Sequence, residues 1–293
     1  MKSACSLDQE SIGCSIEGSK LWVFSESFRV LVGALPDDLP LLSCHMIGSD
    51  RAVVAGAGLC PTEVLLGVIV PSSLPSLSSS LAAEPSKRLR RTDWAVRSHI
   101  LRVSDRGGLT AVALHAQNEG EMHLLWLFLG CQNGDVVRIS LLDKDSAISV
   151  VGSEEVVHSH RMDVRGLSLH SGRILSCSDD GTVLLSLLLA RSSPLIEPLL
   201  VSRDSELLAC VLLSESTALV GTRDRRVIAI EFGLEGFRKK KDPSWQVFDV
   251  PHVPKSVSVI PGTNQIMFTC GAGEAETAYA QSSNGDWEKI NIL

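Results

Sequence analysis

Short apolar runs alternate with polar turns along most of this 293-residue chain. The clearest example is ILSCSDDGTVLLSLLLA at residues 174–190, where the polar turn Ser-Asp-Asp-Gly lies between two apolar runs. Glycine favours such tight turns because it adopts positive φ at little steric cost. A single hairpin cannot bury its own apolar face, so the pattern predicts that similar hairpins pack beside it.

The same pattern recurs, and its recurrence is the strongest structural signal in the chain. Further copies lie at residues 11–25, 125–142, 216–232 and 264–282. From residue 125 onward the copies follow one another at about 40–50 residues, the spacing of propeller blades. No capped segment with helical periodicity interrupts them. We therefore predict an all-β fold, a single WD40-type β-propeller of six or seven four-stranded blades over residues 1–293. The turn Asp179–Gly181 should join the two central strands of its blade.

The segment 71–91 interrupts this pattern. Its first part, PSSLPSLSSSLAAEPS, is rich in serine and proline, and its end, KRLRR, is basic. Such a composition predicts a flexible loop. A degenerate or missing blade is expected between residues 71 and 99.

The composition is that of an ordinary globular protein, with 44% hydrophobic and 21% charged residues. The N-terminal residues MKSACSLDQE lack the apolar core of a signal peptide, and the longest apolar runs are too short to span a bilayer. The eight cysteines are scattered without a CxxC pair, which indicates reduced structural thiols. These features predict a cytoplasmic protein.

The net charge of −7 argues against a general nucleic-acid binder, because such binding depends on cationic side chains. Basic residues nevertheless gather in SKRLRR (86–91) and FRKKK (237–241). A run of like charge is commonly a solvated face. Contact of these two segments with phosphate groups is the alternative interpretation.

Patterns of catalytic residues are missing from the sequence. The phrase VAGAGLCP has Pro61 where a dinucleotide-binding motif has its third glycine. His158 and His160 would share one face of a strand and could hold a metal, but no cysteine or carboxylate lies at a matching spacing. We therefore predict no catalytic residues, no metal and no cofactor, and so a protein that is not an enzyme.

The order of these segments resembles the phosphoinositide-binding β-propellers of autophagy, the PROPPIN or WIPI family. The resemblance is carried by short phrases along most of the chain: RAVVAGAGLCP, SDRGGLTAVAL, SHRMDVRGLSL, SCSDDGTVLLSL and SWQVFDVP. It implies a seven-bladed propeller that docks on phosphoinositide membranes and recruits autophagy partners.

The resemblance also assigns roles to residues. It implies headgroup contacts at His160, Arg161, Ser178, Thr182 and Arg203, with Arg203 and Asp204 standing where the family has two arginines. Guanidinium groups suit this role because they bind phosphate with two hydrogen bonds. It further implies a membrane-inserting loop at Gly233–Ser244, which holds Phe237, Arg238, Lys239, Lys240 and Lys241.

Two functional interpretations follow from these observations. The first is a peripheral membrane adaptor that docks on phosphoinositides. The second is a generic WD-repeat scaffold subunit of a protein or RNA-modification complex, because a histidine before the first strand and a Ser-Asp-x-Gly-Thr hairpin also form the fold of any WD repeat. Both interpretations predict other proteins as partners and a monomeric propeller within a complex.

Overall fold

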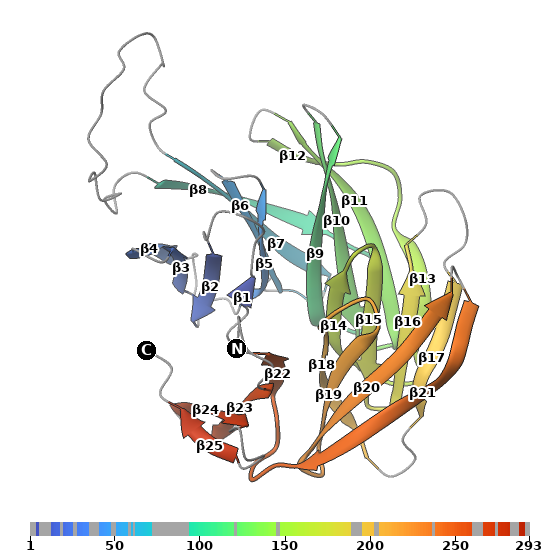
Figure 1. The fold of residues 1–293 in the computed structure, drawn as a ribbon. Coiled ribbons are helices and arrows are strands. Elements are labelled where there is room, and N and C mark those ends of the chain that lie inside the picture. Colours follow the sequence, from blue (N-terminus) through green and yellow to red (C-terminus); the bar gives the residue numbers. More distant parts are fainter. Residues whose placement is uncertain are drawn as a thin grey trace. The chain divides into compact units, whose positions relative to one another are not determined.

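The structure, a computed structural model, describes most of the chain. The described residues are 4–5, 13–17, 20–25, 28–34, 41–47, 51–57, 60, 62–71, 94–119, 122–144, 147–188, 195–201, 205–235, 238–259, 266–272, 275–281 and 287–290. Within these ranges every regular element is a β-strand (Figure 1). Every strand pair whose register is defined is antiparallel. The predicted all-β class is confirmed.

The strands belong to two compact units. The first consists of residues 1–105, 112–127 and 139–154, and the second of residues 106–111, 128–138 and 155–293. The assignment of residues 1–293 to one domain stays a prediction.

Two four-stranded sheets lie in the first unit. One has the order β1 (Ala4–Cys5), β2 (Gly13–Glu17), β3 (Lys20–Ser25) and β4 (Phe28–Ala34). The other has the order β5 (Leu41–Ile47), β6 (Arg51–Ala57), β7 (Glu63–Pro71) and β8 (Trp94–Arg102).

The pairing of β7 with β8 corrects one prediction. These strands pair from Glu63 opposite Arg102 to Pro71 opposite Trp94, so the segment between them is inserted within one sheet and no blade is missing there. The sequence pattern of β8, WAVRSHILR, mixes apolar and charged residues, which hid the strand. Apart from Pro71, the predicted flexible loop at 71–91 lies outside the described residues.

The next sheet departs from the predicted four strands. Its order is β12 (Ala147–Val150), β11 (Asp135–Lys144), β10 (Met122–Cys131) and β9 (Leu109–Glu119), and β13 (Glu155–Ser159) also pairs with β11. The strand β12 pairs with residues 141–144 of β11 and β13 with residues 135–138, so the two together take the place of one fourth strand. Gly152, with a φ of 87°, lies in the break between them.

Three four-stranded sheets complete the second unit. They are formed, in order, by β14 (Val164–His170), β15 (Arg173–Ser178), β16 (Thr182–Leu187) and β17 (Leu195–Val201); by β18 (Leu207–Leu212), β19 (Thr217–Thr222), β20 (Arg226–Glu235) and β21 (Arg238–Asp249); and by β22 (Ser256–Val259), β23 (Ile266–Ala272), β24 (Ala275–Gln281) and β25 (Trp287–Ile290). The turn Asp179–Gly181 joins the central strands β15 and β16, as predicted.

The predicted loop at Gly233–Ser244 is wrong in its boundaries. Strands β20 and β21 continue to pair beyond Glu231 through two register shifts, up to Glu235 opposite Arg238. Arg238, Lys239, Lys240 and Lys241 therefore belong to β21, whereas Phe237 lies outside the described residues. The high charge of this segment favoured a loop in the sequence, but a strand at the border of a sheet tolerates charge.

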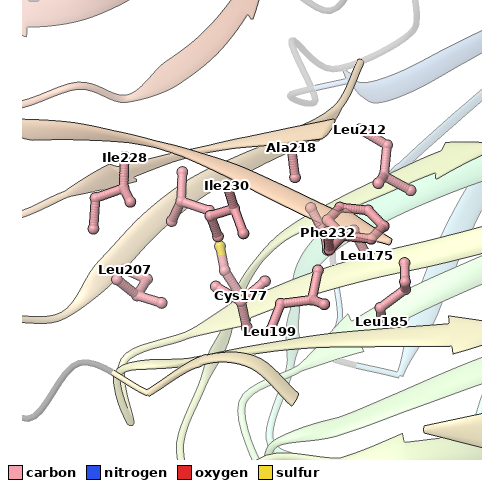
Figure 2. Packing of buried hydrophobic residues seen from close by; sticks show 12 residues of the cluster. Leu175, Cys177, Leu185, Leu199, Leu207, Leu212, Ala218, Ile228, Ile230 and Phe232 are labelled. Atoms are coloured by element: carbon pink, nitrogen blue, oxygen red, sulfur yellow. The ribbon is translucent and has the colours of Figure 1, made fainter. Parts of the chain in front are cut away.

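Alternate residues of neighbouring strands build the core of the second unit. The β14–β17 sheet contributes Leu175, Cys177, Val183, Leu185 and Leu199, and the β18–β21 sheet contributes Leu207, Leu212, Ala218, Val220, Ile228, Ile230 and Phe232 (Figure 2). Successive side chains of a strand point to opposite faces. The residues that alternate with these core positions on β15, Ile174 and Ser176, are also fully buried, on its opposite face.

Candidate functional site

The residues predicted to contact a headgroup gather in part around the hairpin turn between β15 and β16. His160 lies just before β14, Ser178 ends β15 and Thr182 begins β16. Arg161 is exposed next to His160. Arg203 lies outside the described residues. The structure thus brings the histidine and the two hydroxyls to one turn.

Asp180 organises this turn. Its Oδ1 accepts hydrogen bonds from the Thr182 N–H at 2.9 Å and the Thr182 hydroxyl at 2.6 Å, and its Oδ2 accepts one from the Arg161 N–H at 2.8 Å. Burial alone would raise the pKa of Asp180, but these hydrogen bonds outweigh it and the pKa is lowered. The carboxylate is therefore ionised at neutral pH and acts only as an acceptor. Gly181, with a φ of 77°, closes the turn.

His160 links this turn to the buried hydroxyls of the sheet. Its Nδ1 lies 2.7 Å from Thr182 Oγ1, and its Nε2 lies 2.7 Å from Ser176 Oγ. The side chain of His160 has no exposed surface. Both of its ring nitrogens are thus hydrogen-bonded inside the protein.

His158 extends the connection deeper into the sheet. Its Nε2 also lies 2.7 Å from Ser176 Oγ, and its Nδ1 lies 2.7 Å from Ser186 Oγ. The two imidazole rings meet edge to face, with centroids 5.6 Å apart. We call this set of side chains the polar chain; in order it consists of Ser186, His158, Ser176, His160, Thr182 and Asp180.

The direction of every proton in the polar chain follows from its end at Asp180. Because the Thr182 hydroxyl donates to the carboxylate, Thr182 Oγ1 accepts from Nδ1–H of His160. A neutral His160 then accepts at Nε2, so Ser176 Oγ–H donates to it and accepts from Nε2–H of His158. His158 finally accepts at Nδ1 from the hydroxyl of Ser186, the first member of the chain. All donors point one way and none is left without an acceptor.

This arrangement keeps both histidines neutral. Burial, followed by the neighbouring His160, lowers the pKa of His158 to about 3. Burial also lowers the pKa of His160, with partial opposition from Asp180. The nitrogen lone pairs that a metal would need are engaged by hydroxyl groups, and the described residues contain no group of three or more His, Cys, Asp or Glu arranged to hold a metal ion.

Ser178, although predicted as a site residue, has a separate structural role. Its Oγ donates to the carbonyl of Met162 at 3.0 Å and accepts from the Asp180 N–H at 3.2 Å. The side chain is buried. Ser178 therefore fixes the loop before β14 against the hairpin turn.

The hairpin turns of three sheets share a backbone link that the sequence analysis did not identify. The first turn residue donates its N–H to the residue that precedes the first strand of its own sheet: Gln132 to Gly108, Asp179 to Asp163 and Arg223 to Glu206, at 2.9–3.1 Å. Ion pairs reinforce two of these links, between Arg165 and Asp179 at 2.5 Å and between Arg223 and Glu206. The repeated turn pattern in the sequence is the signal from which this recurring hydrogen bond could have been predicted.

Exposed apolar side chains were also missed. On β21, 57% of Trp245 and 48% of Val247 are exposed, and 50% of Met162 is exposed beside Arg161.

No helix of the described residues is long and apolar enough to cross a membrane. Cys131, Cys177 and Cys270 are buried.

No protein-family profile and no curated protein sequence matches this chain. Solved structures do resemble it. The WD40 β-propeller domain of Doa1 has a TM-score of 0.54 and 12% identity, over 99% of this chain and 85% of that one. A chain of the mitotic checkpoint complex has a TM-score of 0.51 and 12% identity, over 96% and 73%. A chain in the structure of BBS1N with ARL6DN has a TM-score of 0.50 and 10% identity, over 98% and 76%.

These similarities establish a fold and nothing finer. They give no evidence for the PROPPIN or WIPI family in particular. Together with the antiparallel sheets of the described residues, they show that the chain has the fold of a WD40-type β-propeller.

Proposed function

We propose that this chain is a non-catalytic adaptor that binds other proteins through the outer strands of its blades. The observation that carries the proposal is the exposure of Trp245 and Val247 on β21. Large apolar side chains that are exposed together are typical of protein interaction sites. The polar chain supports the same conclusion, because all four ring nitrogens of its two buried histidines are hydrogen-bonded to hydroxyl groups of the chain itself.

The names of two similar structures also support an adaptor. One is a chain of the mitotic checkpoint complex, and the other comes from a complex of BBS1N with ARL6DN. A chain with a propeller fold can therefore be a subunit of a protein complex, which is the role proposed for this chain.

The adaptor proposal is tested by native purification followed by reconstitution. The tagged full chain should elute from gel filtration with at least one protein at constant stoichiometry, and the purified partner should bind again to the purified chain. A chain that elutes alone under gentle conditions, with no partner that rebinds, would contradict the proposal.

Docking on phosphoinositide membranes is a second candidate function. It is favoured by the exposed Arg161 and by the four consecutive basic residues at the start of β21. Near an anionic leaflet each basic residue contributes about 1 kcal/mol, so four contribute about 4 kcal/mol before salt screening. Since both ring nitrogens of His160 are engaged in the protein, the contact would rest on Arg161, Arg203 and the basic strand.

Liposome flotation tests this second function. Vesicles with and without phosphatidylinositol phosphates are compared for the parent chain and for a Lys239→Glu, Lys240→Glu, Lys241→Glu variant. An Arg88→Glu, Arg90→Glu, Arg91→Glu variant makes the same change in net charge elsewhere. Lipid docking predicts loss of flotation in the first variant only. Absence of flotation in the parent chain, or equal flotation in both variants, would leave the protein adaptor as the sole candidate.

A further inference from the structure

The strand β21 is an unusual border of its sheet. It has 12 residues, whereas strands average about 5–6 residues. It pairs with β20 on one side and stands last in the strand order, so no described strand pairs with its other side. Residues Ser244–Asp249 pair with β20 without a register shift. This stretch presents a regular row of backbone groups to which another strand can be added.

Apolar side chains lie along this same stretch. Trp245 pairs with Ile230, and Val247 pairs with Ile228. Directly opposite residues in an antiparallel pair share a face of the sheet. Ile228 and Ile230 are buried in the core, 8% and 0% exposed, whereas 48% of Val247 and 57% of Trp245 are exposed. The apolar face of this sheet is therefore buried at β20 and continues onto β21, where its side chains are exposed.

Charge along the strand selects the kind of partner. The first four residues of β21 are Arg238, Lys239, Lys240 and Lys241, in a chain whose net charge is −7. At the other end of the strand, the exposed Asp249 is paired with Arg226, with Asp249 Oδ1 3.5 Å from Arg226 Nε. An acidic group is therefore attracted more strongly to the beginning of β21 than to its end, which gives the edge a direction.

From these three observations we infer that the edge of β21 binds an extended acidic segment of a partner protein by strand addition. The inference rests on the proposed adaptor function and specifies its partner. The segment runs antiparallel to β21, as all defined pairs of this protein do. It places two apolar side chains beside Trp245 and Val247 and, further towards its C-terminus, acidic residues alongside the stretch of β21 that contains Arg238–Lys241.

A synthetic peptide tests the inference directly. The probe is fluorescein-labelled Thr-Val-Thr-Ile-Thr-Gly-Ser-Asp-Glu-Asp-Glu, titrated with the full chain and followed by fluorescence anisotropy at low and physiological salt. Two control peptides replace either the four acidic residues by lysine or the Val and Ile by proline. The inference predicts saturable binding of the probe alone, weakened by salt, and slower amide hydrogen exchange in Ser244–Asp249 when it is bound.

Variants of the chain assign the binding to β21. Trp245→Ser and the Lys239→Glu, Lys240→Glu, Lys241→Glu variant should each weaken binding at least about tenfold, the effect of losing an interface anchor. Trp245→Phe should retain binding. The matched control is Val156→Ser, since Val156 is 44% exposed on β13, which also stands at a sheet border but begins with Glu155. Unfolding by urea confirms that each variant is folded.

Equal binding of the lysine or proline peptide, equal loss in the Val156→Ser control, or unchanged exchange in Ser244–Asp249 would overturn the inference. Binding of phosphoinositide vesicles without binding of the probe would also overturn it. If the natural partner rebinds Trp245→Ser as well as it rebinds the parent chain, the inference fails while the adaptor function stands. If no partner rebinds the parent chain at all, the adaptor function itself fails.

Discussion

The two buried histidines make the stability of the fold depend on pH. The pKa of His158 is about 3 in the folded chain and 6.5 when unperturbed, and burial lowers the pKa of His160 in the same direction. Between these values the unfolded chain binds protons that the folded chain does not. The stabilisation is fully present above pH 6.5 and is lost as the pH falls towards 3, by about 1.4 kcal/mol per pH unit for His158 alone.

Urea unfolding between about pH 7 and about pH 4 measures this dependence. The free energy of unfolding should fall along this range in the parent chain, and the slope should be smaller in His158→Gln. His99→Gln, which changes an exposed histidine, is the control and should keep the parent slope. Equal slopes in all three proteins would contradict neutral buried histidines.

Ser176 is the central member of the polar chain, because its hydroxyl serves both histidines. In Ser176→Ala, Nε2–H of His158 loses its acceptor and Nε2 of His160 loses its donor. Each unsatisfied buried group costs about 1–3 kcal/mol, so we expect the two groups together to destabilise the protein by about 2–6 kcal/mol in urea unfolding. Ser159→Ala, which removes an exposed hydroxyl bonded to Asp135 at 2.6 Å, should cost less than about 1 kcal/mol. A loss of similar size in both variants would argue against the polar chain.

Only part of the polar chain was predictable from the sequence. His160 and Thr182 belong to a phrase typical of WD repeats, and the structure joins them by a hydrogen bond. The connection through Ser176 to His158 and Ser186 has no such signal. It depends on the alternation of β15, which sends Ser176 to the opposite face from Leu175 and Cys177, and that alternation means little until the register of the sheets is known.

Among the elements, the hairpins were predictable from the sequence, but the residues at which their strands begin and end were not. The turns at residues 132–134 and 179–181 join the expected strands because Asn-Gly and Asp-Gly support positive φ. The β20–β21 hairpin was misjudged because hydrogen bonding between its strands outweighs the low strand propensity of the basic run. Charged residues on border strands weaken the alternation on which sequence prediction relies.

Gly134 and Gly152 both have a positive φ but differ in how closely they are packed, so substituting each one distinguishes the energetic cost of backbone conformation from that of close packing. Gly134 has a φ of +91°, and a Cβ atom there would lie 2.3 Å from the carbonyl oxygen of His160. Gly152 has a similar φ of +87°, and a Cβ atom there would meet nothing within 4 Å. Gly152→Ala should therefore cost only the left-handed conformation, about 1–2 kcal/mol.

Gly134→Ala should cost clearly more, because the loop before β14 donates the His160 N–H to the Gly134 carbonyl at 2.9 Å and would have to move. We expect an additional loss of at least about 1 kcal/mol, measured as the difference in the free energy of unfolding. The displaced loop carries His160, so the amide signals of the polar chain should shift in the NMR spectrum of Gly134→Ala only. Equal destabilisation by the two variants would show that the close approach has no energetic weight.

For the whole molecule, the prediction of one domain over residues 1–293 has a thermodynamic consequence. The strands β9, β10 and β11 each contribute residues to both compact units, so the chain of either unit is interrupted by the other. A unit built from such pieces should not keep its sheets when the other unit unfolds. We therefore expect one cooperative transition in calorimetry, with equal calorimetric and van't Hoff enthalpies. Ser176→Ala should lower the temperature of this entire transition, and amides of the β5–β8 sheet should lose protection together with those of the β14–β17 sheet. A variant that lowers only one of two transitions would contradict a single domain and would show that the two units unfold independently.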